Sequence, residues 1–197
     1  MAATQSLENE LTAIKSSGRV PRLMLHCCCA PCASYVLEYL SPFFDITILY
    51  FNPNIQPAEE YGKRAAEFQK LLTHAWYPNS VNIVIDDYDP AGFEAAAAPF
   101  WDEPEGGRRC SACFNLRLKE TAKRAIEGGC ELFATTLSVS PHKNAEMLND
   151  IGGRIAGESG IRFLRADFKK RNGYKRAIEL SKQYGLYRQT YCGCLPN

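Results

Sequence analysis

Apolar positions recur along the chain in two alternating patterns. Short runs in which nearly every residue is apolar are typical of strands buried on both faces of a sheet. Longer segments with apolar residues three or four positions apart are typical of helices that bury one face. The predicted strands are residues 21–26, 44–51, 81–87, 131–139 and 161–168, and the predicted helices are residues 32–40, 59–76, 110–129, 140–160 and 173–186.

Strands that alternate with helices predict one open, mostly parallel sheet, because each parallel pair needs a crossover connection that covers a face of the sheet. We therefore expect a three-layer α/β fold, Rossmann-like, with five mostly parallel strands and helices on both faces. Ser140 and Pro141 are predicted to open the helix at 140–160 as its N-cap and first helical residue. The segment between residues 88 and 109 is predicted to be a long loop.

The composition is that of a soluble globular protein with one good core, since 46% of the 197 residues are hydrophobic and 23% are charged. The first twenty residues are polar and lack the apolar stretch of a secretory signal, and no run approaches the ~18 apolar residues of a membrane span. We therefore expect a cytoplasmic protein without a membrane partner. In a reducing cytosol, nine cysteines indicate metal binding or redox chemistry rather than a disulfide scaffold.

Basic residues gather near the C-terminus. Residues 160–197 contain nine Lys or Arg against two acidic residues, a net +7, which leaves about −6 on the rest of a chain whose total is +1. Such a segment is a candidate binding surface for a polyanion, nucleic acid included, and the alternative is a solvated helix face. Lys169, Lys170 and Arg171 are the candidate phosphate contacts.

Four cysteines, Cys27, Cys28, Cys29 and Cys32, lie at the turn between the first predicted strand and the first predicted helix. Ligands of parallel α/β sheets bind beyond the carboxyl ends of the strands, which is where this turn falls. Neighbouring side chains in such a turn point in different directions, so at least one thiol is expected to face the crevice. Thiols at a helix N-terminus have a lowered pKa and favour the thiolate, the form that binds metal or attacks.

A second pair, Cys110 and Cys113, begins the helix at 110–129. Two thiolates in a C-x-x-C arrangement can chelate one metal centre, and two more from the first turn would complete four sulfur ligands. Both turns precede helices at the same end of the sheet, so the two sets are expected to meet. Four thiolates suit structural zinc or an iron–sulfur cluster. We favour the cluster, because a chain with an ample core does not need zinc to fold.

A third pair, Cys192 and Cys194, lies near the C-terminus and is separated by one glycine. A disulfide between them would close a small, strained ring and would therefore be labile, as redox-active disulfides are. The pair could equally bind a metal, so a redox role and a metal role both stay open. Cys130 is expected to be a buried, small apolar residue.

Two histidines and two asparagines lie near these turns. His26 and His142 are candidates to deliver a proton near neutral pH, and the alternative for each is a polar residue satisfied at the end of an element. Asn52 and Asn54, after the second predicted strand, can hold turns or bind a ligand. The chain has no G-x-G-x-x-G or Walker A pattern, so a resident NAD, flavin or nucleotide is not expected.

The three cysteine sets, together with "FNPNIQP" at 51–57 and "TTLSVSPHKN" at 135–144, resemble the epoxyqueuosine reductases of the QueH family. The match runs from residue 22 to residue 194, so residues 1–20 are predicted to be an N-terminal extension of a single domain, 21–197. The resemblance implies an oxidoreductase that works without cobalamin and reduces epoxyqueuosine in tRNA to queuosine, the last step of queuosine biosynthesis, with electrons from an external donor. It also implies a fold similar to those of sulfonucleotide reductases and ATP pyrophosphatases.

The same resemblance implies roles for individual residues. The ligands of a 4Fe-4S cluster would be Cys28, Cys29, Cys110 and Cys113. Cys192 and Cys194 would form a redox-active disulfide. A mononuclear iron beside the cluster is a further feature of the family, and Cys32, which stands where some members have Asp, is its candidate ligand. Cys27 has no clear family role. Collected by role, the candidate catalytic residues are Cys192, Cys194, Cys32 and His26, and the candidate substrate-binding residues are Asn52, Asn54, Arg109, Lys169, Lys170 and Arg171.

Two other interpretations stay open. "CAPC" at 29–32, before a helix, resembles a thioredoxin-type motif, which would make the protein a dithiol oxidoreductase. Thioredoxin-like chains are usually shorter, however, and need no second C-x-x-C. The other interpretation is a zinc-stabilised module that binds tRNA without catalysis. Stoichiometric zinc would favour the module, and an active, metal-free dithiol would favour the thioredoxin-like enzyme.

Overall fold

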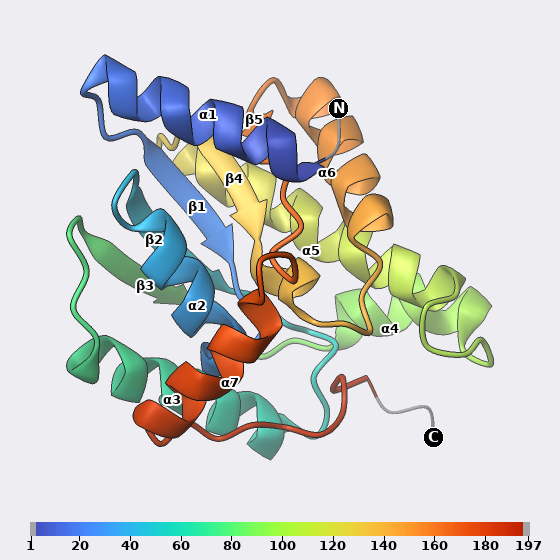
Figure 1. Cartoon of the computed structure of the whole chain (residues 1–197). Helices are drawn as coiled ribbons and strands as arrows, with labels where there is room; N and C mark the ends of the chain where they lie inside the picture. Colours follow the sequence, from blue (N-terminus) through green and yellow to red (C-terminus); the bar gives the residue numbers. More distant parts are fainter. Residues whose placement is uncertain (1–2, 195–197) are drawn as a thin grey trace.

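The computed structural model describes residues 3–194 and contains a five-stranded sheet (Figure 1). Its strands are β1 (Arg22–His26), β2 (Asp45–Tyr50), β3 (Val81–Ile85), β4 (Leu132–Thr135) and β5 (Arg162–Phe163). They lie in the order β3-β2-β1-β4-β5, and every pair of neighbours is parallel. All strands therefore end at the same edge of the sheet, where the loops that follow β1, β2 and β4 come together.

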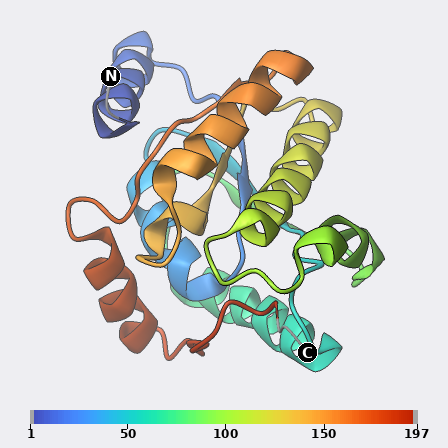
Figure 2. The same cartoon turned by 90° about the vertical axis from the view of Figure 1, so that its right-hand side faces the viewer.

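Helices cover both faces of this sheet, which confirms the predicted three-layer α/β fold (Figure 2). They are α1 (Ala3–Ser17), α2 (Ala30–Leu40), α3 (Ala58–His74), α4 (Ala91–Ala97), α5 (Arg108–Glu127), α6 (Ala145–Ser159) and α7 (Gly173–Gln183). Leu23 and Leu25 of β1 pack in a cluster with α1, α2, α3 and α7, whereas Met24 packs with α5 and α6. This division follows from the strand itself, because successive side chains point to opposite faces.

The N-terminal segment, for which no element was predicted, forms α1. Leu7, Leu11 and Ile14 recur at helical spacing and are buried in the core cluster of the neighbouring sheet face. An ion pair of 2.6 Å between Glu10 and Arg162 joins the helix to β5. The pattern was present in the sequence, but only three apolar anchors stand among many polar residues, so the segment was interpreted as a polar extension.

Three other segments differ from their predicted structure. Part of the predicted loop forms α4, because it buries Phe93 against α5. The strand predicted at 131–139 ends early and continues as the 3-10 helix η2 (Thr136–Val139). The strand predicted at 161–168 is shortened to β5, since the Asn149 side chain takes over both backbone groups of Ala166: it accepts from the N–H at 2.9 Å and donates to the carbonyl at 3.0 Å.

The helix predicted to start at Ser140 begins only after Asn144, so the prediction of Ser140 as N-cap is wrong. The side chain of Asn144 accepts the N–H of Met147 at 3.0 Å and caps α6. Before it, a turn is closed by the N–H of Lys143, which donates to the Ser140 carbonyl at 3.2 Å. Asparagine is as good a cap as serine, and the turn leaves Lys143 free to bury its side chain beside the carboxyl edge of the sheet.

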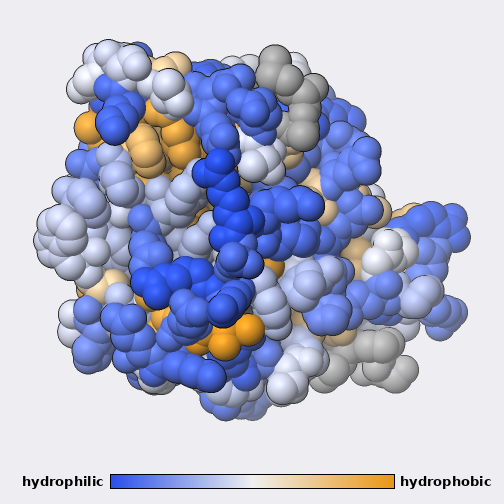
Figure 3. Space-filling view, viewed as in Figure 1, coloured by the Kyte–Doolittle hydropathy of each residue, from blue (hydrophilic) through white to orange (hydrophobic). Residues whose placement is uncertain are grey.

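The surface seen in the view of Figure 1 is largely hydrophilic and carries only small, separated hydrophobic patches (Figure 3). Trp76, just after α3, has the most exposed large apolar side chain of the described residues, with 82% of its surface accessible. Across residues 3–194, none of the helices combines the length and the apolar character that crossing a membrane requires.

Candidate metal and redox site

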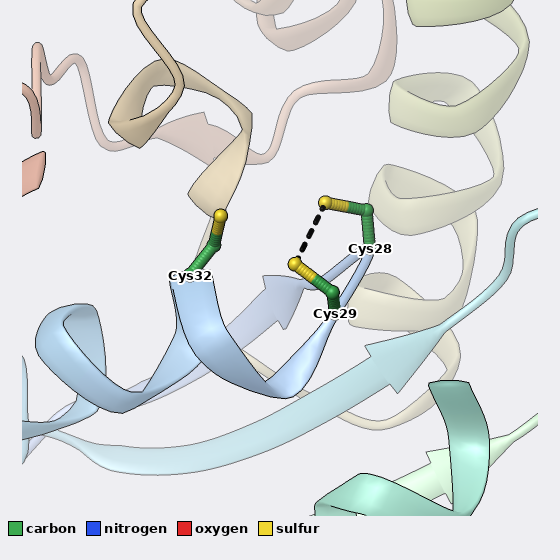
Figure 4. A group of neighbouring side chains, drawn as sticks. All are labelled: Cys28, Cys29 and Cys32. Atoms are coloured by element: carbon green, nitrogen blue, oxygen red, sulfur yellow. Dashed lines mark hydrogen bonds between the residues drawn. The ribbon is translucent and has the colours of Figure 1, made fainter. Parts of the chain in front are cut away.

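Three cysteine sulfurs meet at the turn between β1 and α2 (Figure 4). The Sγ atoms of Cys28, Cys29 and Cys32 lie within 4.8 Å of one another, and those of Cys28 and Cys29 are 3.7 Å apart. The thiols are gathered because β1 ends directly before them and Pro31 starts α2 within its first turn. Metal–sulfur bonds of about 2.3 Å place two ligands of one ion roughly 4 Å apart. The chemistry and spacing of this sulfur group therefore fit a metal.

One sulfur of the group favours the thiolate because of its contacts with the other two. Hydrogen bonds with the thiols of Cys29 and Cys32 lower the pKa of Cys28 well below its usual range. The same contacts raise the pKa of Cys29 to about 12, and they raise that of Cys32 as well. Thiolates rather than thiols bind metals, so metal binding would release these two protons. Cys27 lies outside the group, because its side chain is buried in the core and donates to the Leu25 carbonyl at 3.6 Å.

The second pair, Cys110 and Cys113, lies buried in the first two turns of α5. The sulfur of Cys110 accepts the N–H of Gly106 at 3.2 Å. Cys110 belongs to an apolar cluster against which Cys28 packs, so the two cysteine sets share this cluster. The tight sulfur group at the β1 turn does not include the α5 pair, and the four-ligand set stays a prediction.

Arg117 joins the two sets and was not recognised in the sequence. Its side chain, only 1% exposed, donates to His26 Nε2 at 3.2 Å, to Asn52 Oδ1 at 2.5 Å and to Cys113 Sγ at 3.7 Å. Asn52 in turn donates to the Cys27 carbonyl at 2.9 Å, so the guanidinium ties α5 to the loops after β1 and β2. The signal available was its spacing, since Arg117 follows Cys113 by four residues on the same face of α5.

The two candidate proton donors differ in their surroundings. Burial, and then the charge of Arg117, lower the pKa of His26 to about 3, so its ring is neutral at pH 7. A guanidinium only donates, so Nε2 is the acceptor and Nδ1–H donates to Thr135 Oγ1 at 3.0 Å. These contacts favour a structural role over proton delivery. His142 is exposed and lies at the cavity described below. Cys130, expected to be buried, is only partly buried after the end of α5.

A cavity of about 500 Å³ opens beside the sulfur group. Its walls contain three cations and one carboxylate, a balance that suits an anionic ligand. The cysteines that line it are Cys28, Cys29, Cys32 and Cys192, and the charged residues are Arg117, Lys143, Arg188 and Glu105. Three residues predicted to bind substrate are buried and do not line this cavity: Asn52, Asn54 and Arg109. Asn52 instead supports the cysteine turn through its bond to the Cys27 carbonyl, and Arg109 donates to the Trp101 carbonyl.

The C-terminal pair has one sulfur on this cavity. Cys192 Sγ accepts from Lys143 Nζ at 3.0 Å, whereas Cys194 packs toward the cluster of Phe93 and Cys113. Gly193 between them has φ +114°, a conformation that favours glycine, and a Cβ there would lie 3.0 Å from a side-chain carbon. The tail thus passes the site in one defined conformation and brings the third cysteine set to the other two.

The basic residues predicted to bind phosphates lie before α7. Lys169 pairs with Asp167 at 3.1 Å, and Arg171 pairs with Glu8 of α1. Lys170 is exposed. Two of the three positive charges therefore have an acidic partner within the chain, which reduces the charge that this segment offers to a polyanion.

Comparison with known proteins assigns the family. A sequence model described as epoxyqueuosine reductase QueH matches residues 23–196. The epoxyqueuosine reductase QueH of Streptococcus pyogenes serotype M1 is 43% identical over 177 residues, which cover 89% of this chain and 69% of that protein. The corresponding values are 40% identity, 90% and 76% for Staphylococcus epidermidis, and 36% identity, 88% and 88% for Thermotoga maritima. With a family match over nearly all of its length, the chain belongs to the epoxyqueuosine reductase QueH family.

Proposed function

We propose that this protein is an oxidoreductase that removes the epoxide oxygen of epoxyqueuosine in tRNA and leaves queuosine. The observation that carries the proposal is the meeting of two cysteine sets on one cavity: the sulfur group of Cys28, Cys29 and Cys32, and Cys192 of the tail. Membership of the QueH family supplies the substrate. A cavity of about 500 Å³ is large enough for a modified base.

The cysteines of this chain suit an iron–sulfur cofactor. In the proposed assignment Cys28, Cys29, Cys110 and Cys113 hold a 4Fe-4S cluster, and Cys32 is a ligand of an adjacent mononuclear iron. When bound, such a cluster supplies electrons one at a time. Two features of the protein support it: the N–H donated by Gly106 to the Cys110 sulfur and the guanidinium beside Cys113. Both would stabilise negative charge on sulfur.

The C-terminal pair matches the stoichiometry of the reaction. Deoxygenation of an epoxide to an alkene takes two electrons and two protons and releases water. Oxidation of the Cys192 and Cys194 thiols to a disulfide yields two electrons and two protons, so one pair balances one substrate. An external dithiol would restore the pair by thiol–disulfide exchange and become a disulfide itself.

The charges around the cavity support a tRNA substrate. Arg188 lies in its wall, and Lys170 is exposed in the segment before α7. In the proposed complex, basic side chains contact phosphates and set position, while the modified base enters the cavity, where discrimination arises.

Anaerobic purification followed by assays of iron, sulfide and zinc tests the cofactor. We expect a brown protein with about four or five irons and four sulfides per chain. Cys28→Ala should lose most of the iron, whereas Cys27→Ala, one position earlier but turned into the core, should retain it. Zinc without sulfide in the unmodified protein would contradict the proposal and favour a zinc-stabilised binding module.

Activity is tested with tRNA that contains epoxyqueuosine and a chemical one-electron donor. The tRNA is then digested to nucleosides, which are separated and whose masses are measured by mass spectrometry. The expected product has lost one oxygen atom relative to epoxyqueuosine. Iron-loaded protein that leaves the nucleoside unchanged under these conditions would refute the proposed activity.

A further inference from the structure

Lys143 is a buried lysine at the point where three segments of the chain meet. Its side chain is 7% exposed, and its Nζ lies 2.6 Å from Glu105 Oε1 and 3.0 Å from Cys192 Sγ. Glu105 comes from the loop before α5, Lys143 from the turn before α6, and Cys192 from the C-terminal tail. A buried ammonium needs partners, and these two atoms provide a carboxylate and a sulfur.

The two cysteines of the tail differ in what surrounds them. Cys192 contacts an ammonium and lines the cavity, so a reactant in the cavity can reach its sulfur. Cys194 does not line the cavity and packs toward an apolar cluster instead. The hydrogen bond shared with Cys194, and then the charge of Lys143, lower the pKa of Cys192 to about 5. The same shared hydrogen bond raises the pKa of Cys194.

We propose that Lys143, held by Glu105, is a positioning residue that fixes Cys192 in the cavity wall as the reactive thiol of the tail pair. The proposal rests on the proposed function for its biological meaning, but its geometry is independent of the substrate. The groups that face Cys192 from the elements around it are Lys143, Arg117, Arg64, Cys113 and Cys194, with Glu105 behind the ammonium. Of these, Lys143 is the cation in hydrogen-bond contact with the sulfur itself.

With Cys192 as the reactive thiol, the thiol–disulfide exchange that reduces the Cys192–Cys194 disulfide has a defined order. The thiolate of an external dithiol attacks Cys192 Sγ, the sulfur that lines the cavity, so the Cys192–Cys194 bond breaks and Cys194 leaves as a thiolate that takes up a proton. The second thiol of the reductant then gives up its proton and attacks the reductant sulfur of the mixed disulfide. Cys192 leaves as a thiolate beside Lys143, and the reductant becomes a disulfide, which balances two electrons.

Site-resolved alkylation tests the proposal. The reduced, anaerobically purified protein is treated at pH 7 with a limiting amount of iodoacetamide, which forms an S–C bond and releases iodide. The tryptic peptide that follows Arg188 contains both tail cysteines, and its fragment ions assign the label to one or the other. We expect Cys192 to react at least about tenfold faster than Cys194, because the thiolate is the nucleophile.

Variants separate charge from packing. With the Cys192 rate followed over about pH 4–9, Lys143→Gln should raise the pH at which that rate is half-maximal by about one unit or more. Lys143→Arg, which keeps the cation, should leave this midpoint close to that of the unmodified protein. Lys119→Met, which removes an exposed lysine from α5, should behave as the unmodified protein. Lys143→Met serves as a second charge-removing variant, and circular dichroism confirms the fold of each.

Two results would overturn the proposal: a pH midpoint of the Cys192 rate in folded Lys143→Gln and Lys143→Met equal to that of Lys119→Met, or an upward shift of that midpoint that Lys143→Arg shows as well. Alkylation needs neither tRNA nor turnover. A protein that shows the expected rates but does not reduce epoxyqueuosine would refute only the proposed function, and an active enzyme without the rate difference would refute only the role of Lys143.

Discussion

Replacing Arg117 with methionine would remove the guanidinium that holds the cysteine turn to α5. The buried acceptor Asn52 Oδ1 would lose its donor. His26 would lose the guanidinium too, but its Nε2 lies 3.2 Å from the Phe51 carbonyl, to which it can donate after a change of tautomer. A buried polar group left without a partner costs about 1–3 kcal/mol, so Asn52 predicts a loss of roughly 1–3 kcal/mol in the free energy of unfolding. Removal of the cation brings little compensating gain, because the Cys28 thiolate nearby would lose its counter-charge. For a chain of this size, such a loss lowers Tm by roughly 2–12 °C.

Thermal and urea unfolding, followed by circular dichroism under anaerobic, reducing conditions, measure this loss. Arg154→Met is the matched control, since Arg154 lies on α6 with half of its side chain exposed and pairs with Glu158 at 2.8 Å. Loss of this exposed ion pair should lower the free energy of unfolding by less than about 1 kcal/mol. If Arg117 and Asn52 interact as the structure shows, Arg117→Met combined with Asn52→Ala should cost less than the sum of the two single changes, by about 1 kcal/mol or more. Arg117→Met melting within 2 °C of the Arg154→Met control, or strict additivity with Asn52→Ala, would refute the reasoning.

Three further predictions concern stability and binding. The pKa of His26 is about 3 in the folded chain and about 6.5 when unfolded. The contribution of neutral His26 to the free energy of unfolding is therefore complete above pH 6.5 and falls by up to about 1.4 kcal/mol per pH unit as the pH is lowered toward 3. His26→Gln should flatten this part of the urea-stability profile, and an unchanged slope would contradict the assignment. Leu11→Ala on α1 should lower the free energy of unfolding in urea by about 2–4 kcal/mol, because Leu11 is only 5% exposed. This residue lies before the segment that matches the family model. A loss below about 0.5 kcal/mol would mean that α1 does not share the core. Replacing Lys169, Lys170 and Arg171 with glutamine should weaken tRNA binding and make the slope of log binding constant against log salt concentration shallower by about one to two units. The change is smaller than three units because two of these residues already pair within the chain. An unchanged slope would place the phosphate contacts elsewhere.

Local sequence patterns accounted for the sheet and for the three cysteine sets. The apolar runs of β1, β2 and β4 produced strands that are mostly buried, as strands covered on both faces are. The run of β3 formed a strand at the edge of the sheet, where most of its residues are partly or fully exposed. The patterns failed where a side-chain amide decided the boundary of an element. The strand predicted at 161–168 was cut short by Asn149 of α6, 17 residues away from its partner Ala166. The start of α6 was set by Asn144, a local cap of the same kind as Ser140.

The site shows the same division between local and distant information. The cysteines could be recognised because thiols gathered at helix starts have few other uses in a reducing setting. Arg117 and Lys143 could not, because a lysine or arginine in an amphipathic segment is usually solvated, and only the packed chain shows that both are buried beside sulfur. Asn52 was found by its position, but its partners show it to be a support for the turn.

By itself, the sequence determined the α/β class, the order of the five strands and of the helices between them except α4, and the residues able to carry metal and redox chemistry. These follow from periodicity and from the intrinsic chemistry of thiols. The tertiary structure decided which thiol becomes a thiolate, which sulfur meets the cavity and which cations stand beside them. Those properties depend on burial and on distances between segments far apart in the chain, since electrostatic and hydrogen-bond energies change steeply over a few ångströms and with the exclusion of water.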